Sequence, residues 1–264
     1  MRRNTMPKFS ANLSMLFNEV DFIQRFRAAR QQGFSAVEYM FPYGYAIDTL
    51  RNELAENQLV QVLHNLPAGN WEAGERGIAC LPGREAEFRD GVGLAIEYAR
   101  ALGCQQINCL IGNPDSRVDA DITDSLVVTN LSYAAKEMAK ENIRLLVEPI
   151  NKYDMPAFYL KNTHQALELM TRVGSPNLYL QYDIYHMQRM EGELIQTMQR
   201  LQDKIAHIQV ADNPGRNEPG TGEINYDVIF NALDNMGYSG WIGCEYKPAT
   251  TTVAGLSWVK KYQH

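Results

Sequence analysis

The sequence is poor in histidine and cysteine, and it lacks any apolar run of the length that crosses a membrane. It has five histidines and four cysteines among 264 residues. A membrane-spanning helix needs roughly 20 consecutive apolar residues, so we expect no membrane segment. The N-terminal stretch MRRNTMPKF has two arginines with no apolar region behind them, which does not indicate a signal peptide. We therefore expect a cytoplasmic protein.

The four cysteines show no C-x-x-C spacing, and at least two of them lie in apolar runs. Paired C-x-x-C motifs would indicate a zinc site or a redox pair, and neither is present. The residues are Cys80, Cys104, Cys109 and Cys244. We expect them to be reduced, buried thiols, as is usual inside the cell.

An excess of basic residues is also missing. Lysine and arginine number 25 against 31 aspartates and glutamates, which gives a net charge of −6 and a pI near 5.4. A nucleic-acid-binding surface would predict a basic balance, so we expect no nucleic-acid partner. A small anionic substrate remains compatible with this composition, because one local arginine or lysine can bind it.

No composition shift, low-complexity tract or proline-rich linker divides the chain, and the length suffices for one large barrel. We predict a single domain over residues 1–264, with residues 1–6 as an extension to which we assign no structure. Eight short segments rich in β-branched and aromatic residues predict strands. They are residues 8–14, 36–41, 59–65, 104–112, 143–150, 178–184, 205–212 and 241–246. Amphipathic segments between them predict helices over residues 20–32, 47–57, 84–102, 122–141, 163–173, 194–201, 226–236 and 254–262.

Strict alternation of strands and helices predicts a parallel sheet covered by helices. Eight such units favour closure into a (β/α)8 TIM barrel. The alternative is a doubly wound sheet, which would place a glycine-rich phosphate loop after the first strand. The segment ANLSMLFNE at that position has no glycine, so the barrel is the better prediction.

Acidic and amide side chains recur where predicted strands end. Glu148 ends IRLLVEPI, Asp183 lies in LYLQYDIYH, Gln209 in IAHIQVAD and Glu245 in WIGCEYKP. A buried carboxylate costs free energy unless it is paired, and four such ends in consecutive units predict one shared partner, most simply a divalent cation. An all-oxygen ligand set suits Mg²⁺ or Mn²⁺ better than Zn²⁺.

From the first strand to WIGCEYKP the chain resembles the hydroxypyruvate isomerase family, which belongs to the TIM-barrel sugar isomerases and epimerases. The matching segments are ANLSMLF, AGERGIACLPGRE, VEPIN, YDIYH with its D-x-x-H spacing, HIQVAD, GEINY and GWIGCEYKP. They are long and occur in the order of the family. Within it, the segments are most similar to those of the 2-oxo-tetronate isomerases, which act on four-carbon sugar acids.

This resemblance implies roles for the residues at the strand ends. Glu148 and Glu245 match the family's paired catalytic glutamates, which also touch the metal, and Asp183 and Gln209 match the other metal positions. Many relatives in the wider epimerase group have histidine where this chain has Gln209. That departure argues against Zn²⁺ or Co²⁺ and leaves open whether Mg²⁺ or Mn²⁺ is required.

The resemblance further implies that His186 and Arg216 contact the oxygens of the substrate. A substrate carboxylate needs a cation, for which Arg84, Arg76, Arg216 and Lys247 are candidates, since arginine binds carboxylates in bidentate fashion. His64, at the end of the third predicted strand, either faces the substrate or is a satisfied rim histidine. The loop AGERGIACLPGRE follows the same strand and is a candidate lid.

The implied chemistry is isomerisation of the aldose–ketose type, in which a proton moves between neighbouring carbons through an enediolate. We hypothesise that Glu148 and Glu245 are the acid and base. The predicted reaction interconverts 2-oxo-tetronate with 3-oxo-tetronate, or hydroxypyruvate with tartronate semialdehyde.

Three other functions use the same framework. A ketose 3-epimerase would employ the two glutamates on opposite faces of one carbon. A nuclease like endonuclease IV would need more histidine ligands and a basic surface, and a non-catalytic sugar-acid-binding barrel would not need a base. The sequence does not decide whether the protein forms a homo-oligomer.

Overall fold

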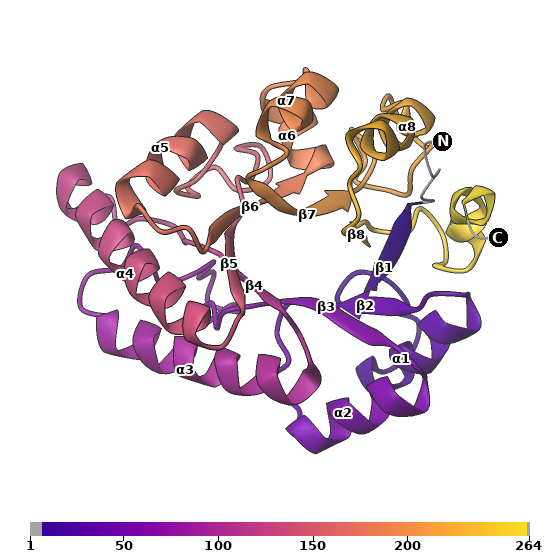
Figure 1. The fold of residues 1–264 in the computed structure, drawn as a ribbon, viewed down its shortest axis with the longest axis horizontal. Helices are drawn as coiled ribbons and strands as arrows, with labels where there is room; N and C mark the ends of the chain where they lie inside the picture. Colours follow the sequence, from indigo (N-terminus) through magenta and orange to yellow (C-terminus); the bar gives the residue numbers. More distant parts are fainter. Residues whose placement is uncertain (1–6, 263–264) are drawn as a thin grey trace. The chain divides into compact units, whose positions relative to one another are not determined.

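The computed structural model describes residues 7–262, in which strands and helices alternate (Figure 1). The predicted extension over residues 1–6 lies outside these residues. The strands are β1 (Lys8–Asn12), β2 (Ala36–Glu38), β3 (Val60–Asn65), β4 (Gln106–Cys109), β5 (Arg144–Val147), β6 (Leu178–Asp183), β7 (Ile205–Val210) and β8 (Trp241–Cys244). The helices are α1 (Phe22–Gln31), α2 (Ile47–Glu56), α3 (Glu85–Leu102), α4 (Ala120–Lys140), α5 (Thr163–Val173), α6 (Ile184–Met190), α7 (Leu194–Leu201), α8 (Tyr226–Met236) and the 3₁₀ helix η1 (Ala254–Lys261).

The strands follow the order of a closed barrel, from β1 to β8 in sequence. The predicted fold class, a (β/α)8 TIM barrel, is confirmed. In a barrel of this kind the carboxyl ends of the strands carry the functional groups.

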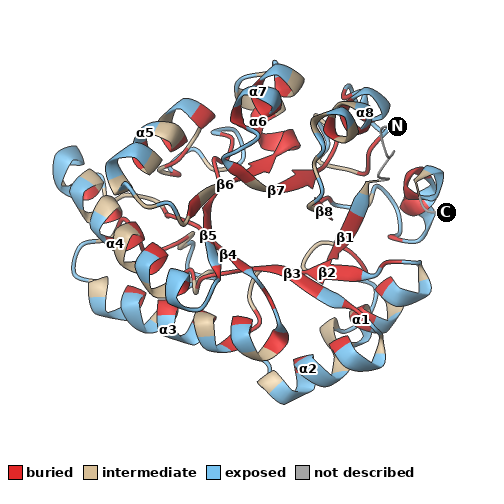
Figure 2. Cartoon of the chain, in the orientation of Figure 1, coloured by how far each residue is buried: buried red, intermediate tan, exposed pale blue. Residues whose placement is uncertain are grey.

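The chain divides into two compact units. The first unit comprises the described part of residues 1–39, 48–62 and 182–264, and the second comprises residues 40–47 and 63–181. In the first unit β7, β8, β1 and β2 pair in parallel, with Phe9 opposite Ile242 and Gln209 opposite Gly243. In the second unit β4 pairs in parallel with β3 and with β5. Strand residues are mostly buried, whereas the helices carry many exposed side chains (Figure 2).

Helices α3 and α8 end directly before glycines, as the sequence predicts. Gly103 after α3 and Gly237 after α8 have φ angles of 68° and 72°, the left-handed conformation in which a residue without Cβ is not strained. The N-terminus of α8 is capped by the side chain of Asn225, which accepts a hydrogen bond from Val228 N. The first and last residues of the predicted helices agree with those in the structure to within two residues.

Two elements differ from the prediction. Helix α6 begins directly after β6, so the D-x-x-H motif spans a strand end and the first turn of a helix. The C-terminal helix is 3₁₀. Its Trp258 packs against Phe9 and Phe230, with ring centroids 5.1 and 5.9 Å away, so aromatic burial holds this last turn.

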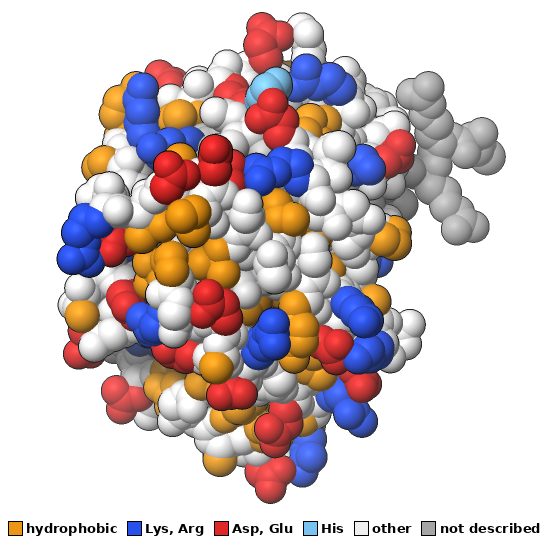
Figure 3. All heavy atoms as spheres, turned by 90° about the vertical axis from the view of Figure 1, so that its left-hand side faces the viewer, with side chains coloured by type: hydrophobic (Ala, Val, Ile, Leu, Met, Phe, Trp, Pro, Cys, Tyr) orange, Lys and Arg blue, Asp and Glu red, His pale blue; other side chains and the backbone are white. Residues whose placement is uncertain are grey.

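The cysteine prediction is confirmed, because all four cysteines are buried and free of disulfides. Among the described residues, none of the helices has both the length and the apolar character required to cross a bilayer. On the face drawn in Figure 3, acidic and basic side chains are interspersed, without a continuous basic patch.

Candidate active site

Glu38, at the end of β2, is the centre of a buried hydrogen-bond network in the first unit. Its Oε1 accepts hydrogen bonds from Gln209 Nε2 at 2.8 Å and from Asn12 Nδ2 at 3.2 Å. Its Oε2 accepts one from Ser10 Oγ at 2.7 Å and lies 2.9 Å from His207 Nε2. All five residues are buried. A carboxylate without a proton can accept four such bonds, so the arrangement matches the ionised form.

Burial works to raise the pKa of Glu38, but attraction to His207 and the hydrogen bonds from His207, Gln209 and Ser10 outweigh it, and the pKa is lowered. Alternation along β7 predicts that His207 and Gln209 lie on one side of the strand, and both do contact Glu38. Because the amide nitrogen of Gln209 donates to Glu38, its amide oxygen faces away from that carboxylate. An amide oxygen is one of the ligand types that hard divalent cations accept.

The carboxylate of Glu38 occupies the space that a side chain at Gly243 would need. A Cβ atom built on Gly243 of β8 would lie 2.3 Å from Oε1 and 2.5 Å from Oε2 of Glu38. Glycine at this position therefore makes room for the network.

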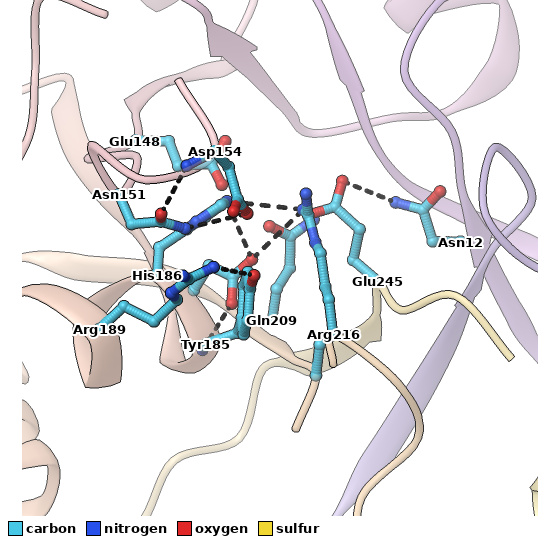
Figure 4. A network of polar contacts seen from close by, with 12 residues as sticks. Asn12, Glu148, Asn151, Asp154, Tyr185, His186, Arg189, Gln209, Arg216 and Glu245 are labelled. Atoms are coloured by element: carbon cyan, nitrogen blue, oxygen red, sulfur yellow. Dashed lines mark hydrogen bonds and ion pairs between the residues drawn. The ribbon is translucent and has the colours of Figure 1, made fainter. Parts of the chain in front are cut away.

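Glu245 follows β8 and is contacted from two sides (Figure 4). Arg216 Nη2 donates to its Oε2 at 3.2 Å, and Asn12 Nδ2 lies 3.4 Å from its Oε1. Burial raises the pKa of Glu245 to about 8, against the opposing effect of Arg216 and with support from the negative charges of Asp183 and Glu38. A carboxyl group with such a pKa can hold and release a proton near neutral pH.

Asp183 and His186 owe their positions to the start of α6. Asp183 is the N-cap residue, and its Oδ1 accepts a hydrogen bond from Tyr185 N at 2.8 Å. Three residues further along, His186 lies on the same face of the helix, with Nε2 3.6 Å from Asp183 Oδ2. Burial raises the pKa of Asp183 above its usual value, partly offset by Arg216. Burial and the charges of Arg216 and Arg189 lower the pKa of His186, which is therefore neutral at pH 7.

The loop between β7 and α8 presents Arg216. Its Nη2 lies 3.5 Å from His186 Nε2 and 3.9 Å from Asp183 Oδ2, and its guanidinium lies over the ring of Tyr185. The backbone of Arg216 has φ 55°, an uncommon conformation for a residue with a side chain. The surrounding loop must therefore hold it in place.

Asp212 holds that loop together. The buried carboxylate of Asp212 accepts hydrogen bonds from the backbone N–H groups of Asn213, Gly220 and Ile224 at 2.8 to 3.1 Å. Its carbonyl oxygen accepts one from Arg216 N at 2.8 Å. The loop conformation thus depends on bonds made within the chain.

In the second unit, Glu148 follows β5 and is buried. Asn108 of β4 donates to its Oε2 at 3.1 Å. After Pro149 the chain turns at Asn151, whose Oδ1 accepts hydrogen bonds from two backbone N–H groups and whose Nδ2 donates to Asp154. The proline and this turn fix the backbone that carries Glu148.

The other predicted substrate contacts have these surroundings. His64 is fully buried at the end of β3, with Nε2 3.2 Å from Ala95 O of α3, and burial lowers its pKa to about 4. Arg84 forms ion pairs with Glu75 at 2.8 Å and with Glu87. Lys247 is exposed. Their roles toward a substrate stay predictions.

Sequence reasoning did not single out two asparagines that contact the predicted catalytic glutamates. Asn12 links Glu38 to Glu245, and Asn108 contacts Glu148. Both lie in short, largely buried strands, Asn12 as the last residue of β1 and Asn108 as the third of the four residues of β4. A polar amide in such a strand was the available signal, since a buried amide needs partners.

The donor chemistry fits a cation that prefers oxygen ligands. In the first unit Asp183 and His186 are buried and offer a carboxylate and an imidazole donor, and in the second unit Glu148 offers a buried carboxylate. Among the described residues, Asp183 Oδ2 has no hydrogen-bond partner, although it is buried. The amide oxygen of Gln209 is a further oxygen donor.

Comparison with known proteins places the chain in a family. Residues 26–262 match the family described as xylose isomerase-like TIM barrel. The chain is 60% identical to hydroxypyruvate isomerase of Escherichia coli, covering 98% of this chain and 100% of that protein. It is 45% identical to 2-oxo-tetronate isomerase of Cupriavidus necator, over 97% and 99% of the two chains. The solved structure of AP endonuclease, family 2, from Brucella melitensis superposes with a TM-score of 0.95 at 42% identity, covering 98% of this chain and 100% of that chain. The protein therefore belongs to the xylose isomerase-like TIM-barrel family, and its full-length relatives make it an enzyme of the isomerase class.

Proposed function

We propose that this enzyme interconverts the 2-oxo and 3-oxo forms of a small hydroxy acid, with hydroxypyruvate and tartronate semialdehyde as the preferred pair. The observation that carries the proposal is the 60% identity, over 98% of this chain, to a protein named hydroxypyruvate isomerase. The 2-oxo-tetronate pair is the second substrate to test, because relatives named for it are 40–45% identical.

The proposed mechanism uses the two buried glutamates at the ends of β5 and β8. In a (β/α)8 barrel these ends belong to the same rim, and we infer that Glu148 and Glu245 flank one substrate. Glu148 removes a proton from C3 of hydroxypyruvate. The electron pair of that C–H bond forms the C2–C3 double bond, and the carbonyl electrons move to O2 to give an enediolate.

Proton delivery completes the reaction. We assign it to Glu245, because its raised pKa lets it retain a proton near neutral pH. That proton passes to C2, the hydroxyl proton on O3 passes to O2, and an aldehyde forms at C3. The proton held by Glu148 returns to Glu245 through solvent, which resets the enzyme.

Two neighbours of Glu245 suit the charge that develops on the substrate. Arg216 carries the positive charge that an enediolate oxygen or a substrate carboxylate requires, and its side chain is 20% exposed. His186 is neutral and can donate a hydrogen bond without adding charge. Both groups would favour the enediolate over the neutral carbonyl form.

A divalent cation fits the same residues. Glu148, Asp183, Gln209 and Glu245 would hold Mg²⁺ or Mn²⁺, and the cation would supply polarisation of the substrate's carbonyl oxygen. The proton transfers described above are carried by the side chains.

The test follows the two substrate pairs by NMR in D₂O, with and without added Mg²⁺ or Mn²⁺. An isomerase incorporates solvent deuterium at carbon and yields the second oxo acid. Replacement of Glu148 or Glu245 by glutamine should lower kcat at least 100-fold, which is the lower range for loss of an acid or base. Glu168→Gln, at an exposed position on α5, is the matched control. Turnover near normal in either active-site variant would remove that residue from the mechanism, and no exchange with any of the four acids would refute the function.

A further inference from the structure

The proposed reaction leaves the buried group at Glu38 without a role, although both of its carboxylate oxygens accept hydrogen bonds from neighbouring side chains. It is fully buried, and four polar side chains converge on its two oxygens. Burying a carboxylate is costly, and a strand end in a barrel could be filled by an apolar side chain instead. The arrangement therefore calls for a function beyond packing.

Two of the four partners connect Glu38 to the site. Gln209 donates its amide N–H to Oε1, and this bond decides which end of the amide faces away from Glu38. Asn12 uses one Nδ2 group toward both Glu38 Oε1, at 3.2 Å, and Glu245 Oε1, at 3.4 Å. The remaining partners, Ser10 and His207, contact the other oxygen.

We propose that Glu38 is a positioning residue, which holds the amide oxygen of Gln209 toward the site. This inference rests on the proposed function for its kinetic consequence, but not for its structural content. An amide turns by 180° at little steric cost, because its oxygen and nitrogen are similar in size. For Gln209, the acceptor fixed at Glu38 Oε1 is what makes the two orientations unequal, whereas the amide of Asn12 is also oriented by Ser14 N, which donates to Asn12 Oδ1 at 3.0 Å.

The geometry distinguishes this role from a purely electrostatic one. In Glu38→Gln, the new amide can place its oxygen toward Gln209 and Asn12 and its nitrogen toward Ser10 and His207. The Ser10 hydroxyl can then turn to accept, and His207 Nε2 accepts in the tautomer that carries the ring proton on Nδ1. Glu38→Gln therefore retains the acceptor that orients the amide of Gln209, whereas Glu38→Met has a similar length and no acceptor.

The first measurement reports on Gln209 directly. The protein is labelled with ¹⁵N-glutamine, and the side-chain resonance of Gln209 is identified by its loss in Gln209→Glu. A hydrogen bond to a carboxylate moves one amide proton downfield. We expect that proton to stay downfield in Glu38→Gln, with a smaller shift, and to return to an ordinary position in Glu38→Met. An unchanged Gln209 resonance in Glu38→Met would overturn the proposal, whatever reaction the enzyme catalyses.

The second measurement is kinetic and uses the full chain. We expect kcat to fall about 10- to 100-fold in Glu38→Met, the range seen when a group that orients a functional residue is removed, with a smaller effect on KM. Glu38→Gln should restore kcat to within a few-fold of the parent. Ser10→Ala removes one partner of Glu38 that reaches neither Gln209 nor Glu245, and it should lower the unfolding midpoint but leave kcat near normal.

The outcomes separate the explanations. Equal loss of kcat in Glu38→Gln and Glu38→Met, at matched folded fractions, would replace positioning by a requirement for charge. Normal kcat in Glu38→Met would refute the proposal and leave the proposed isomerase function intact. Absence of turnover in the parent enzyme would refute the proposed function, and the Gln209 resonance would still decide the orientation.

Discussion

Replacing Gly243 by alanine tests how firmly the network around Glu38 is fixed. The added Cβ would lie 2.3 Å from Glu38 Oε1, and contacts below 3.0 Å are not tolerated, so the carboxylate must move by about 0.7 Å, the difference of the two. A flexible carboxylate on a surface would move freely. This one is held by four side chains, with distances between 2.7 and 3.2 Å, and a displacement of that size breaks part of the set.

The expected magnitude follows from the bonds that are lost. A hydrogen bond to a charged group contributes about 1.5 to 3 kcal/mol, so losing two of the four lowers the free energy of unfolding by about 3 to 6 kcal/mol. Urea unfolding measures this value, and a double-mutant cycle assigns it. In a Glu38→Ala background the clashing carboxylate is gone, and Gly243→Ala should be neutral or slightly stabilising, because alanine suits a strand better than glycine.

Two results would refute this reasoning. Wild-type stability of Gly243→Ala would show that the carboxylate moves without cost, and the network would then be loose. The same destabilisation in both backgrounds would show that the strain arises elsewhere than at Glu38. In the expected case kcat of Gly243→Ala falls as well, because Gln209 and Asn12 lose their common acceptor.

Three further predictions concern Arg216, His64 and the four cysteines. Arg216→Lys should lower kcat/KM about 10- to 100-fold in steady-state assays, because a single ammonium cannot reproduce the contacts of a planar guanidinium with Glu245 and His186, and unchanged kinetics would exclude Arg216 from the site. Burial lowers the pKa of His64 from 6.5 to about 4 in the folded protein. Between pH 6.5 and pH 4 the unfolded protein therefore binds a proton at His64 that the folded protein does not. Lowering the pH over this range should reduce the free energy of unfolding by about 3 kcal/mol. Urea titrations of the parent and His64→Gln should show that difference at pH 4 and little of it at pH 7, and parallel curves would contradict the assignment. The four cysteines should resist alkylation at pH 8 in the native protein and react after unfolding, since all are buried and burial raises the pKa of the Cys80 thiol to about 12; rapid labelling of the native protein would refute this.

The alternation of strands and helices was readable from the sequence because it depends on local patterns. Gly103 and Gly237 could be read as helix ends because a glycine adopts the left-handed backbone conformation that ends a helix, and this property belongs to the single residue. Helix α6 was not predicted, because its seven residues, IYHMQRM, are too short to show a helical period and follow a strand without a break. The 3₁₀ geometry of the last helix depends on tertiary packing around Trp258, which no local pattern reports.

Some residues of the candidate site could be predicted from the sequence, and others could be found only in the structure. Carboxylates at strand ends were visible because charge contrasts with the apolar strand before it. Asn12 and Asn108 were not, because an amide gives little contrast and its importance lies in the partner that it contacts. The lowered pKa of Glu38 depends on residues from β1 and β7, far away in sequence, so its role required the structure.

The Asp212 loop has a consequence for how substrate recognition can be changed. The carboxylate of Asp212 accepts hydrogen bonds from three backbone N–H groups, so the loop is ordered before any ligand binds. Substrate binding therefore does not include the entropic cost of ordering this loop. The backbone of Arg216 is therefore held in one position before a substrate binds. A change in the length of this loop would break the hydrogen bonds to Asp212 that hold it. Substitution of Arg216 alone leaves those hydrogen bonds intact, and it is therefore the safer route to an altered substrate range.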